Sequence, residues 1–225
     1  MIKKLMLGIS AICSLYACSK VDDNFKNMVV PSGVLYTAKT DQLTTWSGRE
    51  RMMLSWRRGP DTKIKSAIVY WNTGKDSMSF DVPALPSTDS VFVLIPRLPE
   101  SSYSFTVITR DGAGHHSVPV SILGNTYGPV YEGSLQPRVV KSSKMVGSDF
   151  YVYWYKSNDV TNVNTRLNYT DLAGALQTVD NPGDPDSIVL KNAKKGSFCK
   201  FQTMFKPTAT SIDTFYSRVD SVKVP

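Results

Sequence analysis

Side chains that perform enzyme chemistry are scarce in this sequence. Its 225 residues include three cysteines and two histidines, and only Glu50, Glu100 and Glu132 are glutamates. The histidines, His115 and His116, are adjacent, and no further ligands stand at the spacing of a zinc site. A glycosidase needs two facing carboxylates, whereas most of the aspartates here fall in turns. We therefore predict no catalytic residue, no metal site and no cofactor, so the chain is not expected to be an enzyme.

Long hydrophobic runs are also lacking. The longest apolar stretch, residues 5–17, is shorter than the roughly 20 residues that a transmembrane helix needs. Because it follows Lys3 and Lys4, it predicts the hydrophobic region of a secretory signal peptide spanning residues 1–17. No later segment approaches transmembrane length.

The end of this stretch, Leu15-Tyr16-Ala17-Cys18, resembles a bacterial lipobox. The resemblance implies that Cys18 becomes the new N-terminus and carries acyl chains that anchor the protein in a membrane. An ordinary signal peptide that happens to contain a cysteine is the alternative. Residues 18–32 would then form the lipidated N-terminus and a tether.

The tether begins Ser19-Lys20-Val21-Asp22-Asp23, a lysine followed closely by acids. This order is similar to the signal that sends lipoproteins of the Bacteroidetes phylum to the cell surface, although a solvated tether would look the same. We expect a lipid-anchored protein of the outer membrane that faces the cell surface, with the periplasmic face left open.

The cysteines of the sequence indicate whether the folded part can form a disulfide. Once Cys13 leaves with the signal and Cys18 carries lipid, only Cys199 remains in the folded part, so no internal disulfide can form. A lone cysteine on a strand is expected to be a small buried hydrophobe.

Removal of Lys3 and Lys4 lowers the formal net charge from +7 to +5, and the remaining excess is spread evenly along the chain. Nucleic-acid binding requires a concentrated basic stripe, so that class of partner is excluded.

From about residue 33 onward, short alternating runs are separated by Gly, Pro, Asn and Asp, which is typical of an all-β sandwich. The strands expected in the first half are 51–56, 65–71, 78–82, 90–95, 103–110 and 117–123. Those expected in the second half are 150–155, 164–170, 176–180, 187–190, 199–205 and 216–224.

The two halves repeat each other. The alternating residues Met52, Leu54 and Trp56 recur 98 positions later as Phe150, Val152 and Trp154. A unit of roughly 97 residues has the size of an immunoglobulin-like module, and internal repetition excludes a single large barrel. We predict one module over residues 33–126 and another over residues 127–225.

The first copy resembles fibronectin type III in its strand ending at Trp56, in Ala67-x-Val69-x-Trp71 and in the run from Leu98 to Val107. This resemblance implies two tandem fibronectin type III-like β-sandwiches after the lipoprotein signal peptide. It also implies that Tyr103 is a corner tyrosine whose hydroxyl bonds to nearby backbone. In the second copy Cys199 takes that position, so the bond is not expected there.

The whole chain also resembles a family of Bacteroidetes lipoproteins defined only as a domain of unknown function, number 4998. The segments that carry this resemblance are 67–72, Leu98-Pro99-Glu100 with Tyr103, 124–128 and 212–216. It implies a place among proteins of glycan capture, and therefore polysaccharide or outer-membrane transport proteins as partners.

Aromatic side chains are the candidates for ligand binding. Trp46 is expected in the polar loop 44–48, either exposed or folded as a lid onto the end of the sandwich. With Trp154 inward, Tyr151, Tyr153 and Tyr155 point outward along one strand and suit a polysaccharide or partner surface, or an interface between the two modules. We predict a non-catalytic surface lipoprotein that binds glycan or a partner in polysaccharide uptake. A structural or adhesive spacer without a small-molecule ligand is the alternative.

Overall fold

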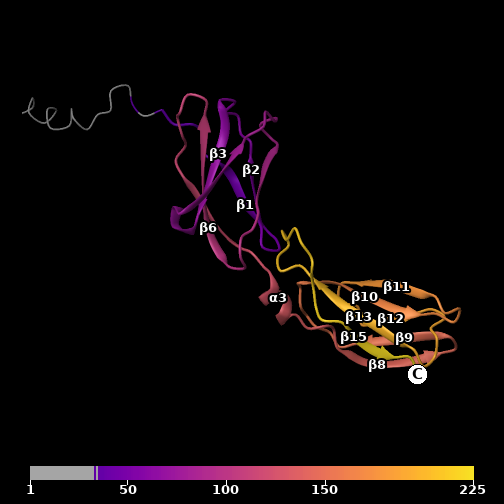
Figure 1. Ribbon diagram of the computed structural model, residues 1–225. Coiled ribbons are helices and arrows are strands. Elements are labelled where there is room, and N and C mark those ends of the chain that lie inside the picture. The colour runs from indigo at the N-terminus through magenta and orange to yellow at the C-terminus, as the bar shows by residue number, and fades with distance from the viewer. Residues whose placement is uncertain (1–32, 34) are drawn as a thin grey trace, which may run out of the picture. The chain divides into compact units, whose positions relative to one another are not determined.

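A computed structural model describes Gly33 and residues 35–225. The expected signal peptide and the whole of the expected tether, including Cys18, lie outside the described residues. Residues 37–225 form one compact unit built almost wholly of β-strands (Figure 1). In the part of the chain that the structure describes, no helix combines the length and apolar character needed to cross a bilayer.

Two antiparallel sheets form the first sandwich. The smaller sheet has the order β1-β2-β5, and its strands are β1 (Asp41–Ser47), β2 (Met52–Arg57) and β5 (Ser90–Ile95). The larger has the order β4-β3-β6-β7, and its strands are β3 (Ile64–Trp71), β4 (Asp76–Asp81), β6 (Ser102–Asp111) and β7 (Val120–Asn125). A short 3-10 turn, η1 (Asn72–Gly74), joins β3 to β4.

The second sandwich repeats this arrangement. Its smaller sheet has the order β12-β9-β8, with β8 (Val140–Val146), β9 (Asp149–Trp154) and β12 (Ser187–Leu190). Its larger sheet has the order β11-β10-β13-β14, with β15 also paired to β13. These strands are β10 (Asn162–Thr170), β11 (Leu176–Pro182), β13 (Phe198–Phe205), β14 (Phe215–Tyr216) and β15 (Asp220–Lys223). One short helix, α3 (Pro129–Ser134), lies between β7 and β8 (Figure 1).

Each sandwich has its own core between its two sheets. In the first, Leu54 of β2 and Phe105 of β6 are fully buried in one cluster, and in the second Phe150 and Phe201 are buried in another. Alternation along each strand turns every second side chain inward, and each such burial contributes about 1.5–3 kcal/mol. The predicted all-β fold with two tandem β-sandwiches is thus confirmed.

The structure corrects several strand assignments. Strands β1 and β8 were not predicted, and the expected strand 216–224 divides into β14 and β15. Trp46, expected in a loop, lies within β1. Threonines, serines and lysines dominate β1 and β8, so the apolar alternation that identifies a half-buried strand is weak in both.

The corner tyrosine of the first sandwich is confirmed. The Tyr103 hydroxyl donates to the Pro99 carbonyl oxygen at 2.9 Å. In the second sandwich Cys199 is fully buried at the corresponding position. There Tyr169 of β10 donates from its hydroxyl to the Lys191 carbonyl oxygen at 2.9 Å, so a similar bond is made from a different strand.

Candidate functional site

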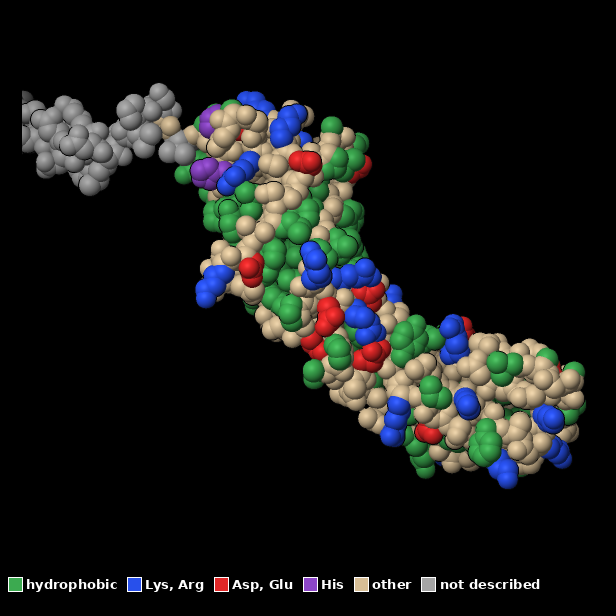
Figure 2. Space-filling model, viewed as in Figure 1, with side chains coloured by type: hydrophobic (Ala, Val, Ile, Leu, Met, Phe, Trp, Pro, Cys, Tyr) green, Lys and Arg blue, Asp and Glu red, His purple; other side chains and the backbone are tan. Residues whose placement is uncertain are grey.

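The outer face of the β1-β2-β5 sheet is apolar and aromatic. Met53 of β2 is the cross-strand partner of Trp46 on one side and of Leu94 on the other. Phe92, the partner of Ser55, is 56% exposed and Leu94 is 42% exposed. We call Trp46, Met53, Phe92 and Leu94 the aromatic face. Hydrophobic side chains gather over the middle of the first sandwich in the space-filling view (Figure 2).

Trp46 is fixed in this face. Its indole N–H donates to the Ser55 hydroxyl at 2.7 Å, and its ring centroid lies 6.3 Å from that of Phe92. The side chain is half-buried rather than folded over the end of the sandwich. The sequence therefore identified the residue but placed it in the wrong local structure, and it did not identify Phe92.

The equivalent face of the second sandwich carries Tyr151 and Tyr153 of β9, which alternate with buried Phe150 and Val152. The Lys144 ammonium of β8 lies 5.9 Å and 5.6 Å from the two tyrosine ring centroids. Tyr155 is 56% exposed but follows the end of β9. The structure therefore brings Tyr151 and Tyr153 together and leaves Trp46 on a different sheet.

Three segments distant in sequence meet where the two sandwiches join, and we call residues 47–51, 127–132 and 212–216 the joint. Both guanidinium Nη atoms of Arg49 donate to the Glu132 carboxylate at 2.7 Å. Arg51 donates to Asp213 through Nε at 2.9 Å and Nη2 at 2.5 Å. Asp213 also accepts the backbone N–H of Arg49 at 2.8 Å. These contacts tie the first sandwich to the helix and to the loop before β14.

Aromatic packing fills the joint. The Tyr131 ring lies 4.8 Å from Tyr127 and 5.2 Å, edge-on, from Phe215. The Arg49 guanidinium carbon lies 4.7 Å from the Phe215 centroid. Gly48 has no space for a side chain, because a Cβ there would be 2.7 Å from the Asp213 carboxylate.

Two carboxylates of the joint, Asp213 and Glu132, are held in the ionised form. Hydrogen bonds from Arg51 lower the pKa of Asp213, and those from Arg49 lower the pKa of Glu132. Segments 124–128 and 212–216, which carried the family resemblance, both contribute residues to this joint. Their sequence pattern therefore corresponds to contacts between the two sandwiches.

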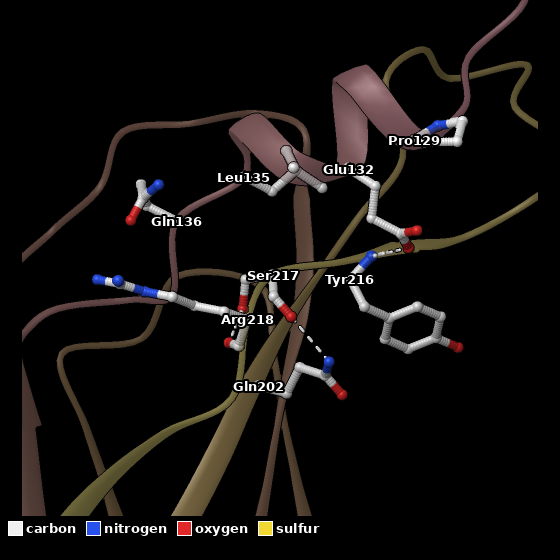
Figure 3. A pocket seen from close by; sticks show the side chains of 9 residues that line it. Pro129, Glu132, Leu135, Gln136, Gln202, Tyr216, Ser217 and Arg218 are labelled. Carbon is white, nitrogen blue, oxygen red and sulfur yellow. Dashed lines mark hydrogen bonds between the residues drawn. The ribbon is translucent and has the colours of Figure 1, made fainter. Parts of the chain in front are cut away.

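A cleft of about 810 Å³ lies beside α3 (Figure 3). Gln202 donates from Nε2 to the Ser217 carbonyl oxygen at 2.7 Å, and Glu132 accepts the Tyr216 backbone N–H at 3.2 Å. The residues that line it are Pro129, Glu132, Gly133, Leu135, Gln136, Gln202, Tyr216, Ser217 and Arg218. Because they come from separate elements, no local sequence signal marked them.

His115 Nδ1 lies 2.7 Å from the carboxylate of Asp111, the last residue of β6, and His115 itself lies in the turn that follows this strand. Over Gly33 and residues 35–225, no group of three or more His, Cys, Asp and Glu side chains is arranged to hold a metal ion.

Comparison with known proteins gives a family. No match was found among curated proteins. Among solved structures, the FN1–FN3 domains of chicken CNTN1 match 84% of this chain with 14% identity and a TM-score of 0.47, and this chain spans 65% of theirs. A segment of two fibronectin type III domains from chicken tenascin matches 82% of this chain and is itself 98% covered, with 17% identity and a TM-score of 0.32. The family model DUF4998, described as a domain of unknown function, matches residues 18–215, and the chain therefore belongs to this family.

Proposed function

We propose that this protein is a non-catalytic lipoprotein of the outer membrane, anchored through Cys18, that binds polysaccharide or a partner of a polysaccharide-uptake complex. The observation that carries the proposal is the aromatic face, where Trp46 and Phe92 lie side by side on an open sheet. Aromatic rings stack on the apolar C–H surfaces of sugar rings, and the half-buried Trp46 offers such a ring at little cost in side-chain entropy.

The shape of the face suits an extended ligand. Small molecules are usually enclosed in concave pockets, whereas the outer surface of a sheet can contact a long chain along the strand direction. Ser55, within the same face, has its hydroxyl occupied by the Trp46 indole, so the ring is held in place before a ligand arrives. Binding of a ligand then costs little conformational entropy of the protein, because the side chain is already ordered.

The test is retention of the soluble form, residues 19–225, in native gels that contain single polysaccharides. We expect at least one polysaccharide to retard the protein, and Trp46→Ala or Phe92→Ala to abolish the effect. Phe198→Ala is the matched control, because Phe198 of β13 is also 56% exposed but lies in the second sandwich. Retardation that survives both substitutions would contradict the assignment of the face.

The second aromatic surface is tested separately. Tyr151→Ala and Tyr153→Ala remove the two rings beside Lys144, and loss of retention in these variants would place the ligand on the second sandwich instead. Tyr155→Ala tests the third tyrosine predicted from the sequence, which is 56% exposed.

Membrane anchoring has its own experiment. In cells supplied with a labelled fatty acid, we expect the native protein to carry label and to sediment with outer membranes, facing the surface or the periplasm. Cys18→Ala should lose both properties. A Cys18→Ala protein that stays labelled and membrane-bound would contradict the lipobox interpretation.

A structural or adhesive spacer is the second candidate, and the joint is the observation that favours it. Two bidentate arginine–carboxylate pairs and three packed rings connect the sandwiches. A spacer protein requires such contacts to hold its modules together. This function predicts that no polysaccharide retards the protein and that an outer-membrane protein is recovered with it after cross-linking.

A further inference from the structure

Arg218 carries an uncompensated charge in the cleft beside α3. Arg49, Arg51, Arg138 and Arg166 each form an ion pair with a carboxylate. Arg218 makes no such pair with any described residue. The acid that lines the cleft, Glu132, has both oxygens occupied by Arg49 at 2.7 Å. Arg218 is therefore the charged side chain of the cleft lining that has no ion-pair partner among the described residues.

Planar amides accompany the guanidinium. Gln202 uses one N–H on the Ser217 carbonyl oxygen and keeps its own amide oxygen free of protein donors. Gln136 reaches the Ser134 carbonyl oxygen only at 3.5 Å. In Figure 3 Gln136 and Arg218 lie at the end of the cleft away from the Tyr216 ring, and both also line the neighbouring cleft.

We propose that this cleft binds a sugar residue that carries a carboxylate, such as a uronic acid within a polysaccharide. The Arg218 guanidinium matches a carboxylate in bidentate geometry. The amides of Gln136 and Gln202 can both donate to and accept from sugar hydroxyls. Leu135 and the 37% exposed Tyr216 supply apolar contact for ring C–H groups.

Size and charge support this class of ligand over others. The volume of about 810 Å³ falls within the range of small-molecule sites, roughly 300–1,000 Å³. A phosphate ion could accept hydrogen bonds from Arg218 and the amides, but it has no C–H surface to contact Leu135 and Tyr216. The inference rests on the proposed function for its class of ligand, a polysaccharide, and assigns it a second site, because the cleft is formed by α3 and the second sandwich and does not include the aromatic face.

The experiment is calorimetric titration of residues 19–225 with an oligomer of galacturonic acid, beside its methyl ester and a neutral galactose oligomer. We expect binding of the acid form alone. Arg218→Ala should weaken it about tenfold or more, because a charge-assisted bidentate contact is lost. Gln202→Ala should weaken it less. Arg110→Ala is the matched control, since Arg110 of β6 is also exposed, without an ion pair to any described residue, and is expected to bind normally.

Three results would overturn the inference. They are no binding of the acid oligomer by the native protein, equal binding of its methyl ester, and unchanged binding by Arg218→Ala. Tighter binding of poly-glutamate than of the oligomer would overturn the saccharide assignment. Trp46→Ala should bind the oligomer as the native protein does. If Trp46→Ala loses binding while Arg218→Ala keeps it, the cleft is wrong and the proposed aromatic face stands.

Discussion

At the scale of single residues, two tyrosine hydroxyls perform similar tasks from different strands. Tyr103 of β6 bonds to Pro99, and Tyr169 of β10 bonds to Lys191. Both residues are largely buried, and burial raises the pKa of each phenol. Each hydroxyl therefore stays protonated at neutral pH and donates a neutral hydrogen bond to a backbone carbonyl.

Removal of the first of these hydroxyls gives a direct prediction. Tyr103→Phe should lower the free energy of unfolding by about 0.5–1.5 kcal/mol, the net worth of one hydrogen bond, measured by urea denaturation of residues 19–225. Tyr70→Phe is the control, because Tyr70 is half-buried and its hydroxyl makes no hydrogen bond to the described residues. Equal stability of Tyr103→Phe and the native protein would show that the corner bond contributes nothing.

Cys199 gives a second prediction at this scale. It is fully buried, and burial raises the pKa of its thiol to about 12. The reactive thiolate is therefore almost absent at pH 8. In residues 19–225, where it is the only cysteine, we expect no reaction with Ellman's reagent until urea unfolds the second sandwich. Reaction at the rate of a free thiol without urea would contradict the burial.

Sequence reasoning recovered some of the candidate site residues and missed others for a physical reason. Alternation along β9 correctly predicted that Tyr151 and Tyr153 lie on the outer face. In β5 the run from Val91 to Ile95 is apolar throughout, so alternation could not show that Phe92 and Leu94 face outward. Arg218 could not be assigned, because its cleft depends on contacts with α3.

At the scale of elements, eleven of the structure's strands, all except β1, β8, β14 and β15, match the strands expected from the sequence one to one. Strands β1 and β8 differ: each is the third strand of its smaller sheet and is identified by its ladder to β2 or β9 rather than by its own residues. A strand of this kind depends on its neighbour for stability. Whether such a segment forms a strand is decided by its pairing with a neighbouring strand, which the local sequence pattern does not show.

The loop before β14 yields a prediction about charge. Asp213→Asn removes the ion pair with Arg51, and we expect a loss of about 1–2 kcal/mol of unfolding free energy at pH 7. Because the folded pKa of Asp213 is lowered, its contribution is complete above the unfolded pKa near 4 and is lost as pH falls through the folded value. The difference between native and variant stabilities should therefore shrink below about pH 4.

A comparable pair within one sheet serves as the control. Arg166 and Asp180 also form a bidentate contact, at 2.9 Å and 3.1 Å, but both side chains are nearly half exposed. Asp180→Asn should cost less than about 1 kcal/mol, the usual range for an exposed pair. A cost equal to that of Asp213→Asn would mean that the joint adds nothing to an ordinary surface ion pair.

At the scale of the whole molecule, two separate cores are connected through the joint. The internal repeat predicted the two sandwiches, because equivalent buried residues recur at a constant offset. It could not predict the joint, since Gly48, Arg51, Glu132 and Asp213 have no equivalents that repeat. Family resemblance marked segments 124–128 and 212–216, but only the structure places them against Arg49 and Arg51.

This arrangement predicts how the molecule unfolds. Gly48→Ala would place a methyl group 2.7 Å from the Asp213 carboxylate and 2.9 Å from Ile212. We expect it to cost about 1–3 kcal/mol and to separate the unfolding of the two sandwiches in differential scanning calorimetry. Gly112→Ala is the control, because a Cβ there meets nothing within 4 Å. Identical heat-capacity curves for native protein and Gly48→Ala would show that the sandwiches unfold independently.

The joint also has a consequence for the order of folding. Asp213 lies 162 residues after Arg51, so a chain that emerges from its N-terminus completes the first sandwich long before the partner of Arg51 exists. Until then the ion pair of Arg51 with Asp213 cannot form, and the first sandwich must be stable without it. Closure of a loop of this length costs substantial entropy, and we expect it to follow formation of both cores. A late kinetic phase in refolding, absent from Gly48→Ala, would report that final docking step.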